Sequence, residues 1–503
     1  MAETLKEKTA KGLFWGGLSG GMTQVLNVVI GILLGRMLSP DEWAPISMIT
    51  IFSAIAGNLQ SSGFSTAIVN MKQPTANDYN AVFWFNVSMG FVLYWLLFAA
   101  APFIALFFEQ PCLTNLSRLI FLAFFISSFG ISTQAYLTKN MMQREIAIVN
   151  LSALMVSGTV AVTLALKGYS YWSLAWQQIV NSAVLVVGRF FFVKWRPSLK
   201  VDFTPIRQTY RFAMSILVTM VINTVNSNIL TFIFGKLFTK TPATVGNFFQ
   251  AFKWNTMAYQ VVGGMLEQVA QPVLVETSPP ALIPEQSSPT RSLSQGEGAE
   301  NVERLRRVFR KMLRFTAFVS FPALLGLSMV SEEFILATIG AKWQGCVPLL
   351  RILCIGGAFM PFYSLYKNLV ISQGRGALNM WLNVVQIVLQ LLLILMTYRE
   401  GIITVVWTYT VFNILWLCVW QLYAKRLIGI RLADMLKDTL PFGCISLIIM
   451  VLTWWVTQPL TNVYGLLAAR VVMAGLLYVG LMKLLRVRIL DECINFILKR
   501  NKP

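Results

Sequence analysis

The sequence contains no histidine among its 503 residues. It therefore lacks the side chain most often used for acid–base catalysis and for binding metal ions. Its six cysteines form no CxxC pair, and most fall in apolar segments, where cysteine acts as a small core residue. They are Cys112, Cys346, Cys354, Cys418, Cys444 and Cys493. A nucleotide-binding P-loop is also missing. These absences favour a protein that is not an enzyme and needs no metal or other cofactor.

Charged residues are scarce as well. They make up 12% of the chain, whereas soluble domains contain about 25%. Hydrophobic residues make up 56%, and no hydrophilic stretch is long enough for a sizeable soluble domain. A polytopic glycosyl or acyl transferase would need a large loop, or acids and histidines gathered at a membrane face, and the chain has neither. The composition therefore predicts an all-α polytopic membrane protein.

Apolar runs of membrane-spanning length recur from end to end and predict about fourteen transmembrane helices. The expected spans are 12–34, 45–69, 81–108, 116–138, 146–166, 171–193, 212–238, 244–275, 315–338, 347–371, 378–398, 402–424, 442–456 and 463–485. The first span is too long for the apolar core of a signal peptide, so we expect it to be retained.

Lysine and arginine give the chain a formal net charge of +20, and they concentrate in alternate loops. In a soluble protein such an excess would favour nucleic-acid binding, but here the positive-inside rule explains it better. We therefore expect no nucleic-acid partner. The predicted location is the cell inner (plasma) membrane, with both termini in the cytoplasm.

The chain shows signs of an internal repeat with an offset of about two hundred residues. Gly35-Arg36-Met37-Leu38 closes the first span, and Gly235-Lys236-Leu237-Phe238 closes the seventh. Polar residues at i, i+4 and i+8 precede both: Ser19, Thr23 and Asn27, then Thr219, Asn223 and Ser227. Such strips are either cavity faces or ordinary hydrogen-bonding faces between helices.

The repeat predicts two six-helix lobes plus two C-terminal helices. The expected domains are 1–200 (N-lobe), 201–437 (C-lobe) and 438–503 (the last two spans and a basic cytoplasmic tail). The C-lobe carries a cytoplasmic insertion at about 276–314. Its first part is rich in proline, serine and glycine and is expected to be disordered. Its second part is a basic amphipathic helix that lies on the membrane surface or extends the ninth span.

Residues 244–275 are long and apolar enough to cross a bilayer, yet they contain Lys253 and Glu267. Polar or small residues recur there at steps of three and four: Lys253, Thr256, Gln260, Gly264, Glu267 and Gln271. This spacing places them on one stripe of a helix. Because a charge at the bilayer centre costs roughly 2.5–3.5 kcal/mol, the stripe is expected to face water or protein. Alternatively, Lys253 snorkels to one surface and Glu267 pairs with a neighbouring helix.

Five segments resemble a known family: GRMLSPDEW, VFWFNVSMG, GKLF followed by VGNFF, ERLRRVFRKMLRFTAFVSFP, and AKWQGCVPLLRIL. The chain resembles the polysaccharide transporters, or Wzx-type lipid-linked oligosaccharide flippases, in particular the colanic-acid-type branch. These belong to the multidrug/oligosaccharidyl-lipid/polysaccharide exporter superfamily. The similarity runs from Leu5 to about Arg431. The chain departs from the family in three places. It has a proline-rich insertion, Gln250 stands where family members often have a basic residue, and Trp43-Ala44-Pro45 replaces the glycine usual at the start of the second span.

The resemblance implies a central cavity between two lobes and alternating access. It further implies that an undecaprenyl-pyrophosphate-linked saccharide unit moves from the cytoplasmic to the periplasmic leaflet, for O-antigen, capsule or exopolysaccharide biosynthesis. The expected partners are the lipid-linked oligosaccharide, membrane lipids, and a polymerase or other polysaccharide-assembly proteins. The alternative is an ion-coupled multidrug or cation antiporter of the same superfamily. That activity would require acids deep in the first six spans, where none is found.

A pyrophosphate headgroup requires positive charge in a hydrated cavity. The candidates for binding it are Lys253, Lys236, Arg36, Lys367 and Arg118. The candidates for binding sugar hydroxyls are Asn223, Asn226, Asn27, Gln24 and Gln260. Arg189 and Arg470 are equally well explained as residues that snorkel to the interface. Glu267 is the candidate for ion coupling, with the membrane potential worth about 2.3 kcal/mol per charge per 100 mV.

Overall fold

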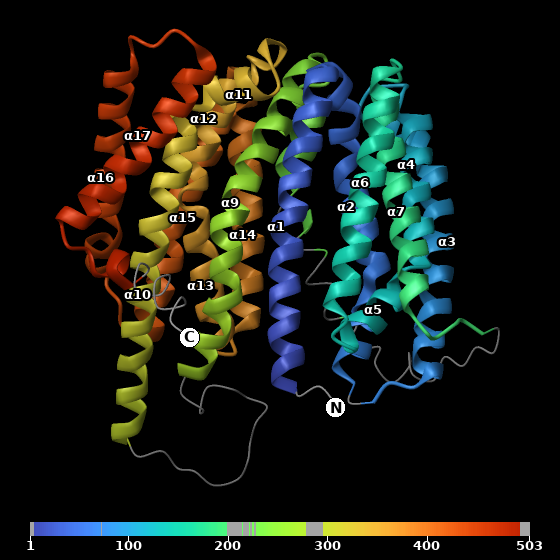
Figure 1. Ribbon diagram of the computed structural model, residues 1–503, viewed down its shortest axis with the longest axis horizontal. Coiled ribbons are helices and arrows are strands. Elements are labelled where there is room, and N and C mark those ends of the chain that lie inside the picture. Colours follow the sequence, from blue (N-terminus) through green and yellow to red (C-terminus); the bar gives the residue numbers. More distant parts are fainter. Residues whose placement is uncertain are drawn as a thin grey trace. The chain divides into compact units, whose positions relative to one another are not determined.

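The computed structural model describes residues 5–71, 73–198, 214, 221, 224–225, 228–277 and 295–492. Every regular element in these ranges is helical (Figure 1). The chain divides into two compact units, Met1–Phe249 (unit 1) and Gln250–Pro503 (unit 2), and each is described by itself. This division lies within a helix, and it does not test the predicted boundaries at residues 200 and 437.

Unit 1 contains seven labelled helices and one short described stretch of another. They are α1 (Leu5–Met37), α2 (Pro40–Asn70), α3 (Ala76–Phe107), α4 (Leu113–Ser128), α5 (Ile131–Lys139), α6 (Gln143–Leu166), α7 (Trp172–Phe192) and the stretch Asn228–Leu237. Helix α9 (Pro242–Thr277) begins in unit 1 and continues into unit 2.

Unit 2 continues with helices that run almost to the end of the described chain. They are α10 (Gln295–Met329), α11 (Ser331–Thr338), α12 (Cys346–Gly357), α13 (Met360–Ser372), α14 (Gly376–Thr397), α15 (Ile402–Ile428), α16 (Leu432–Thr457) and α17 (Val463–Leu484). Two short 3₁₀ turns, Ala341–Trp343 and Tyr398–Glu400, connect some of them.

Among the described residues, nine helical segments are long and apolar enough to cross a membrane, and the bent pair α4–α5 provides a tenth. Helices α2, α7 and α9 coincide with three more predicted spans. Helices therefore occupy every predicted span, although the seventh, 212–238, is only partly described and its continuous described helix is Asn228–Leu237. The predicted fold class is confirmed: this is an all-α, multi-pass membrane protein.

The ninth predicted span is interrupted between α10, which ends at Met329, and α11, which begins at Ser331. Two further predicted spans, the fourth and the tenth, are interrupted near their middles and are called here the broken spans. The fourth span is interrupted between α4 and α5, which meet at a bend of 43°. The tenth is interrupted between α12, which ends at Gly357, and α13, which begins at Met360. At each break a carbonyl oxygen accepts a hydrogen bond from another helix: Arg189 Nη1 donates to Gly130 at 3.2 Å, and Ser320 Oγ donates to Ala358 at 2.7 Å.

The packing order also repeats between the two units. In unit 1, α4 contacts α3 and α7, and α7 contacts α6. In unit 2, α12 contacts α10 and α15, and α15 contacts α14. The two broken spans therefore occupy equivalent places in their units. This is the pattern expected of the six-helix repeat that the sequence predicts.

Buried amide groups hold the interior of unit 2 together. Tyr363 on α13 donates its hydroxyl to the carbonyl of Asn413 on α15 at 2.6 Å. Gln386 on α14 donates to Asn413 Oδ1 at 2.8 Å. Hydrogen bonds of this kind between membrane helices contribute about 0.6 kcal/mol on average. They fix which faces of the three helices meet.

The basic segment ERLRRVFRKMLRF belongs to α10, a single helix that continues into the ninth span (Figure 1). Of the two placements that the sequence leaves open, the structure has the extended one. Asp438 on α16, with a side chain 3% exposed, accepts hydrogen bonds from Arg310 Nε at 2.6 Å and Arg314 Nε at 2.7 Å. Arg306 lies 3.4 Å from Asp434. Much of this basic surface is therefore packed against α16.

A second ion pair lies near the other end of α16. Arg470 Nη1 on α17 lies 2.5 Å from Glu333 Oε1 on α11, and Arg470 Nε donates to Thr457 Oγ1 at 3.1 Å. Arg470 is buried, so the idea that it snorkels to the interface is wrong. Asp438 and Thr457 are nineteen residues apart on one helix, or about 28 Å, which is close to the thickness of the hydrocarbon core.

Candidate functional site

Helix α9 has one face that packs into unit 2. Ala251, Asn255 and Val262 are buried on that face. A Cβ on Gly357 of α12 would lie 2.2 Å from Asn255 Oδ1, so the two helices approach closely only because residue 357 is glycine. The Trp254 ring meets Phe334 of α11 edge-on, with 5.1 Å between the ring centroids. The packing of Trp254 indicates a core role.

The polar stripe predicted on this helix lies on the opposite side. At 100° per residue, Lys253 and Gln260 are about 140–180° from Asn255 and Val262. Lys253 is half-buried and Gln260 is exposed. A Cβ placed on Gly264 would meet nothing within 4 Å. The described part of the stripe therefore faces away from the core of unit 2. The Glu267 side chain lies outside the described residues.

Helix α13 contributes a second polar strip. Ser364 and Lys367 are half-buried, whereas their neighbours Leu365, Tyr366 and Leu369 are buried. The Tyr259 hydroxyl of α9 lies 3.4 Å from Ser364 Oγ, so α9 and α13 meet at this point. Lys253 lies about 9 Å along α9 from Tyr259, and Lys367 lies about 4.5 Å along α13 from Ser364. We call the surface formed by Lys253, Thr256, Gln260, Ser364 and Lys367 the basic face.

The basic face combines two ammonium groups with an amide and two hydroxyls on one side of unit 2. Ammonium groups bind phosphate through charge-assisted hydrogen bonds, and amides and hydroxyls bind sugar hydroxyls. Two predicted residues, Lys253 and Gln260, thus lie on one side of α9, and a third, Lys367, lies on α13, which meets α9 at Tyr259 and Ser364. Sequence patterns had not indicated Ser364. The break between α12 and α13 sets the direction of its helix. Gly356-Gly357 and Pro361 mark the break in the sequence, but they do not show which way α13 then points.

The candidates on α1 lie in a different environment. Asn27 is half-buried on the side of α1 that also carries the buried Ile30 and Leu34. This side packs against α6, where Ile30 meets Gly158. Gln24, nearly one turn earlier, is also half-buried. This placement favours the helix-packing explanation of the polar strip, and a role in sugar binding stays a prediction. Asn223 and Asn226 lie outside the described residues.

The three basic candidates of unit 1 lie at or near helix ends. Arg36 is exposed in the last turn of α1. The Arg118 guanidinium carbon lies 4.2 Å from the centre of the Phe98 ring, a cation–π contact between α4 and α3. Lys236 donates to the carbonyl of Phe107 at 2.6 Å.

Lys236 also forms an ion pair with Glu109 at 2.9 Å. The hydrogen bond from Lys236 and its charge hold the pKa of Glu109 below its usual value. Lys236 is thus bound to the connection between α3 and α4. Whether it also binds pyrophosphate stays a prediction.

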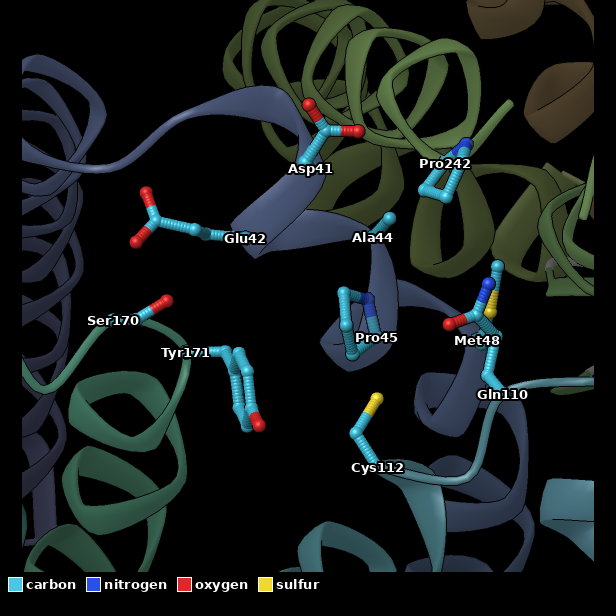
Figure 2. Close-up of a pocket in the computed structure, with 10 residues that line it drawn as sticks. All are labelled: Asp41, Glu42, Ala44, Pro45, Met48, Gln110, Cys112, Ser170, Tyr171 and Pro242. Carbon is cyan, nitrogen blue, oxygen red and sulfur yellow. The ribbon is translucent and has the colours of Figure 1, made fainter. Parts of the chain in front are cut away.

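Unit 1 contains a pocket of about 280 Å³ that none of the predicted site residues lines. Figure 2 shows side chains from the start of α2, the α3–α4 and α6–α7 connections and the start of α9 around it. Its lining residues are Asp41, Glu42, Ala44, Pro45, Met48, Gln110, Cys112, Ser170, Tyr171 and Pro242. Glu42 caps α2 by accepting hydrogen bonds from Ser39 N and Oγ. One of the two acidic residues that line the pocket therefore has a structural role.

Comparison with solved structures supports the fold. The structure entitled "Lipid II flippase MurJ, inward closed conformation" superposes with a TM-score of 0.70 at 14% identity, covering 96% of this chain and 99% of that chain. A transporter of the MOP superfamily from Pyrococcus furiosus superposes with a TM-score of 0.54, covering 84% of this chain and 96% of that chain, also at 14% identity. At such identities the likeness shows the fold alone.

Curated relatives come from polysaccharide pathways. The lipopolysaccharide biosynthesis protein WzxC of Escherichia coli K12 is 24% identical over 387 residues, covering 76% of this chain and 73% of its own. The teichuronic acid biosynthesis protein TuaB of Bacillus subtilis is 24% identical over 414 residues, covering 82% of this chain and 81% of its own. The succinoglycan biosynthesis transport protein ExoT of Rhizobium meliloti is 21% identical over 443 residues, covering 88% of this chain and 83% of its own. The model of the polysaccharide biosynthesis protein family matches residues 33–279 and 288–348, and the chain belongs to this family.

Proposed function

We propose that this protein is a flippase that moves a lipid-linked saccharide repeat unit across the cell inner membrane, from the cytoplasmic to the periplasmic leaflet. It does so by alternating access, for the assembly of a surface polysaccharide. Membership of the polysaccharide biosynthesis family and the names of WzxC, TuaB and ExoT support this class of substrate. The MurJ-like fold is compatible with it.

The observation that carries the proposal is the orientation of α9. Its buried face binds α12 through Asn255 and Gly357, which turns Lys253 and Gln260 away from the core of unit 2. Lysines held on the surface of a membrane-embedded unit are costly in contact with lipid. We infer that the basic face borders a hydrated path, where Lys253 and Lys367 bind the pyrophosphate and Gln260 binds a sugar hydroxyl. Glu267 is proposed to couple transport to an ion gradient.

The direct test follows the substrate in cells. A strain that lacks the protein is expected to keep completed lipid-linked units in the cytoplasmic leaflet, where reagents outside the spheroplast cannot reach them. An enzyme defect would instead leave no completed unit. If the units reach the periplasmic leaflet at the normal rate without the protein, the proposal is wrong.

Substitutions then test the site. Lys253→Ala is expected to reduce polymer export at least about tenfold, because it removes a charge-assisted bond to a buried phosphate. Lys253→Arg is expected to retain part of the activity. Lys483→Ala, an exposed lysine in the last turn of α17, is the matched control. Normal export by Lys253→Ala, at normal protein levels, would remove Lys253 from the site.

The proposed orientation places both termini in the cytoplasm, and it is tested separately. Reporter fusions or cysteine labelling at each terminus should give the cytoplasmic result. A periplasmic terminus would contradict the predicted topology without affecting the family assignment. The proposed partners, a polymerase and other polysaccharide-assembly proteins, are open to crosslinking in the same cells.

A further inference from the structure

Unit 2 contains an apolar groove of about 620 Å³ between α10, α11, α16 and α17. Of the residues that line it, Arg470 and Tyr478 alone have polar side chains. Both are already engaged: Arg470 binds Glu333 and Thr457, and the Tyr478 hydroxyl donates to the carbonyl of Phe318 at 2.8 Å. The other walls are hydrocarbon. The groove is therefore suited to a hydrocarbon chain and poorly suited to a sugar.

The groove extends along α10 and is open on its α17 side. It follows α10 from Phe318 to Met329, a distance of about 16 Å. Val471 and Val479, on its α17 side, are 56% and 48% exposed. One leaflet of a bilayer has a hydrocarbon depth of about 15 Å, half of the roughly 30 Å core. The groove thus has the length of one acyl chain.

One end of the groove lies beside a cluster of arginines. Arg314 precedes Phe318 by one helical turn, about 6 Å along α10. Arg310 and Arg314 share a single carboxylate, Asp438, so the three side chains carry a net charge of +1. The Arg314 side chain is 48% exposed, and its Nε and Nη2 bind Asp438. This end of the groove therefore lies near a partly exposed positive charge.

We propose that unit 2 binds an anionic phospholipid at this position, with its phosphate at Arg310 and Arg314 and one acyl chain in the groove. The arginines match the negative charge of such a lipid, and the groove, which is about as long as one leaflet is deep, matches the length of its acyl chain. A polyprenyl carrier is much longer than one leaflet and would leave most of its chain outside the groove. The site is separate from the basic face of α9 and α13, and it does not depend on the proposed transport activity.

The acyl-chain half of the site can be tested by filling the groove. Gly475 lines it, and a Cβ placed there meets nothing within 4 Å, so Gly475→Leu adds a side chain to open space. Gly480 on the same helix has equally open space and does not line the groove, so Gly480→Leu is the matched control. Binding of fluorescent phosphatidylglycerol to the full-length protein in phosphatidylcholine nanodiscs is the measurement.

Gly475→Leu is expected to weaken phosphatidylglycerol binding about tenfold or more, because it displaces several buried methylene groups worth about 0.8 kcal/mol each. Gly480→Leu is expected to bind as the wild type does. Equal affinities of the two variants would overturn the groove assignment. A second measurement needs no variant: phosphatidylglycerol with short acyl chains should compete weakly, and soluble glycerol phosphate should not compete. Full competition by glycerol phosphate would also overturn it.

The headgroup half is tested by charge. Arg314→Gln should weaken phosphatidylglycerol binding about fivefold and leave phosphatidylcholine binding unchanged, since one arginine near a membrane surface is worth about 1 kcal/mol. Arg307→Gln removes an equal charge from the exposed side of the same helix and should have a smaller effect. Equal binding of the two lipids to the wild type would overturn the anionic assignment. Polyprenyl phosphate is the last competitor. If it displaces the fluorescent lipid at a lower concentration than unlabelled phosphatidylglycerol does, the ligand of this site is the polyprenyl carrier and the phospholipid assignment is wrong.

Discussion

Arg470 and Glu333 form an ion pair with an Nη1–Oε1 distance of 2.5 Å, and their side chains are only 7% and 11% exposed. The same guanidinium donates to Thr457, so one side chain connects α17, α11 and α16. Glu333 Oε2 is buried and has no hydrogen-bond partner among the described residues. Two charges removed from water in this way depend strongly on each other.

We expect Glu333→Gln to destabilise the protein by about 3–5 kcal/mol, because it leaves Arg470 buried without a counter-charge. The double variant Glu333→Leu with Arg470→Met should be less destabilised than either single variant. Thermal unfolding in a mild detergent is the measurement. Additive losses in the double variant would show that the two residues do not depend on each other.

The two aspartates that face α10 should differ in importance. Asp438 is buried and binds Arg310 and Arg314, whereas Asp434 is 24% exposed and lies 3.4 Å from Arg306. We expect Asp438→Asn to cost about 3 kcal/mol or more and Asp434→Asn to cost much less. The same unfolding assay in low and high salt checks this, because added salt should reduce only the Asp434 effect. Equal losses would contradict the burial argument.

The start of α9 should not tolerate a side chain at Gly246. A Cβ there would lie 1.9 Å from the carbonyl oxygen of Pro40, so the two helix starts would have to separate. Overpacking of this kind costs about 1–3 kcal/mol. Gly264→Ala, on the same helix with open space around it, is the control. The two variants are compared by expression level and melting temperature, and an unchanged Gly246→Ala protein would show that the approach of α9 to α2 is looser.

The ion pair between Glu109 and Lys236 should make stability depend on acidic pH. The pKa of Glu109 is lowered in the folded protein from its usual 4.5 by the hydrogen bond and charge of Lys236. A lowered folded pKa means that the contribution is present above the unfolded pKa and is lost as the pH falls through the folded pKa. Melting temperatures of the wild type and Glu109→Gln should therefore differ at pH 7 in low salt and converge in strong acid.

The Lys236→Ala background supplies the control for this comparison. There, Glu109→Gln should have no effect at pH 7, because the partner is already gone. A persistent effect would show that Glu109 acts through the backbone or through another residue. Because both side chains are well exposed, the effect is expected to be small and sensitive to salt.

The helices were predictable because apolar runs of bilayer length leave the chain few alternatives. The stripe through Lys253 and Gln260 was predictable as well, since it depends only on helical spacing. Which way that stripe faces could not be predicted. It is set by Asn255 against Gly357 and by Tyr259 against Ser364, contacts between residues about a hundred positions apart.

The ion pairs could not be predicted either, because their partners are also far apart in the sequence. Arg310 and Asp438 are separated by 128 residues, and Arg470 and Glu333 by 137. The sequence shows a basic helix and isolated charges in apolar segments, and both patterns usually indicate contact with the membrane surface. Only the packing of α16 and α17 against α10 and α11 gives these charges partners inside the protein.

The two broken spans differ in the side chain that donates a hydrogen bond to the break. A long arginine side chain reaches the carbonyl of Gly130 in one unit, whereas a short serine reaches that of Ala358 in the other. Each break thus receives one side-chain hydrogen bond from a different helix, and a point mutation can remove one of these bonds without changing the other. Two breaks at equivalent places can in this way differ in stiffness while the chain keeps the same packing order in both units.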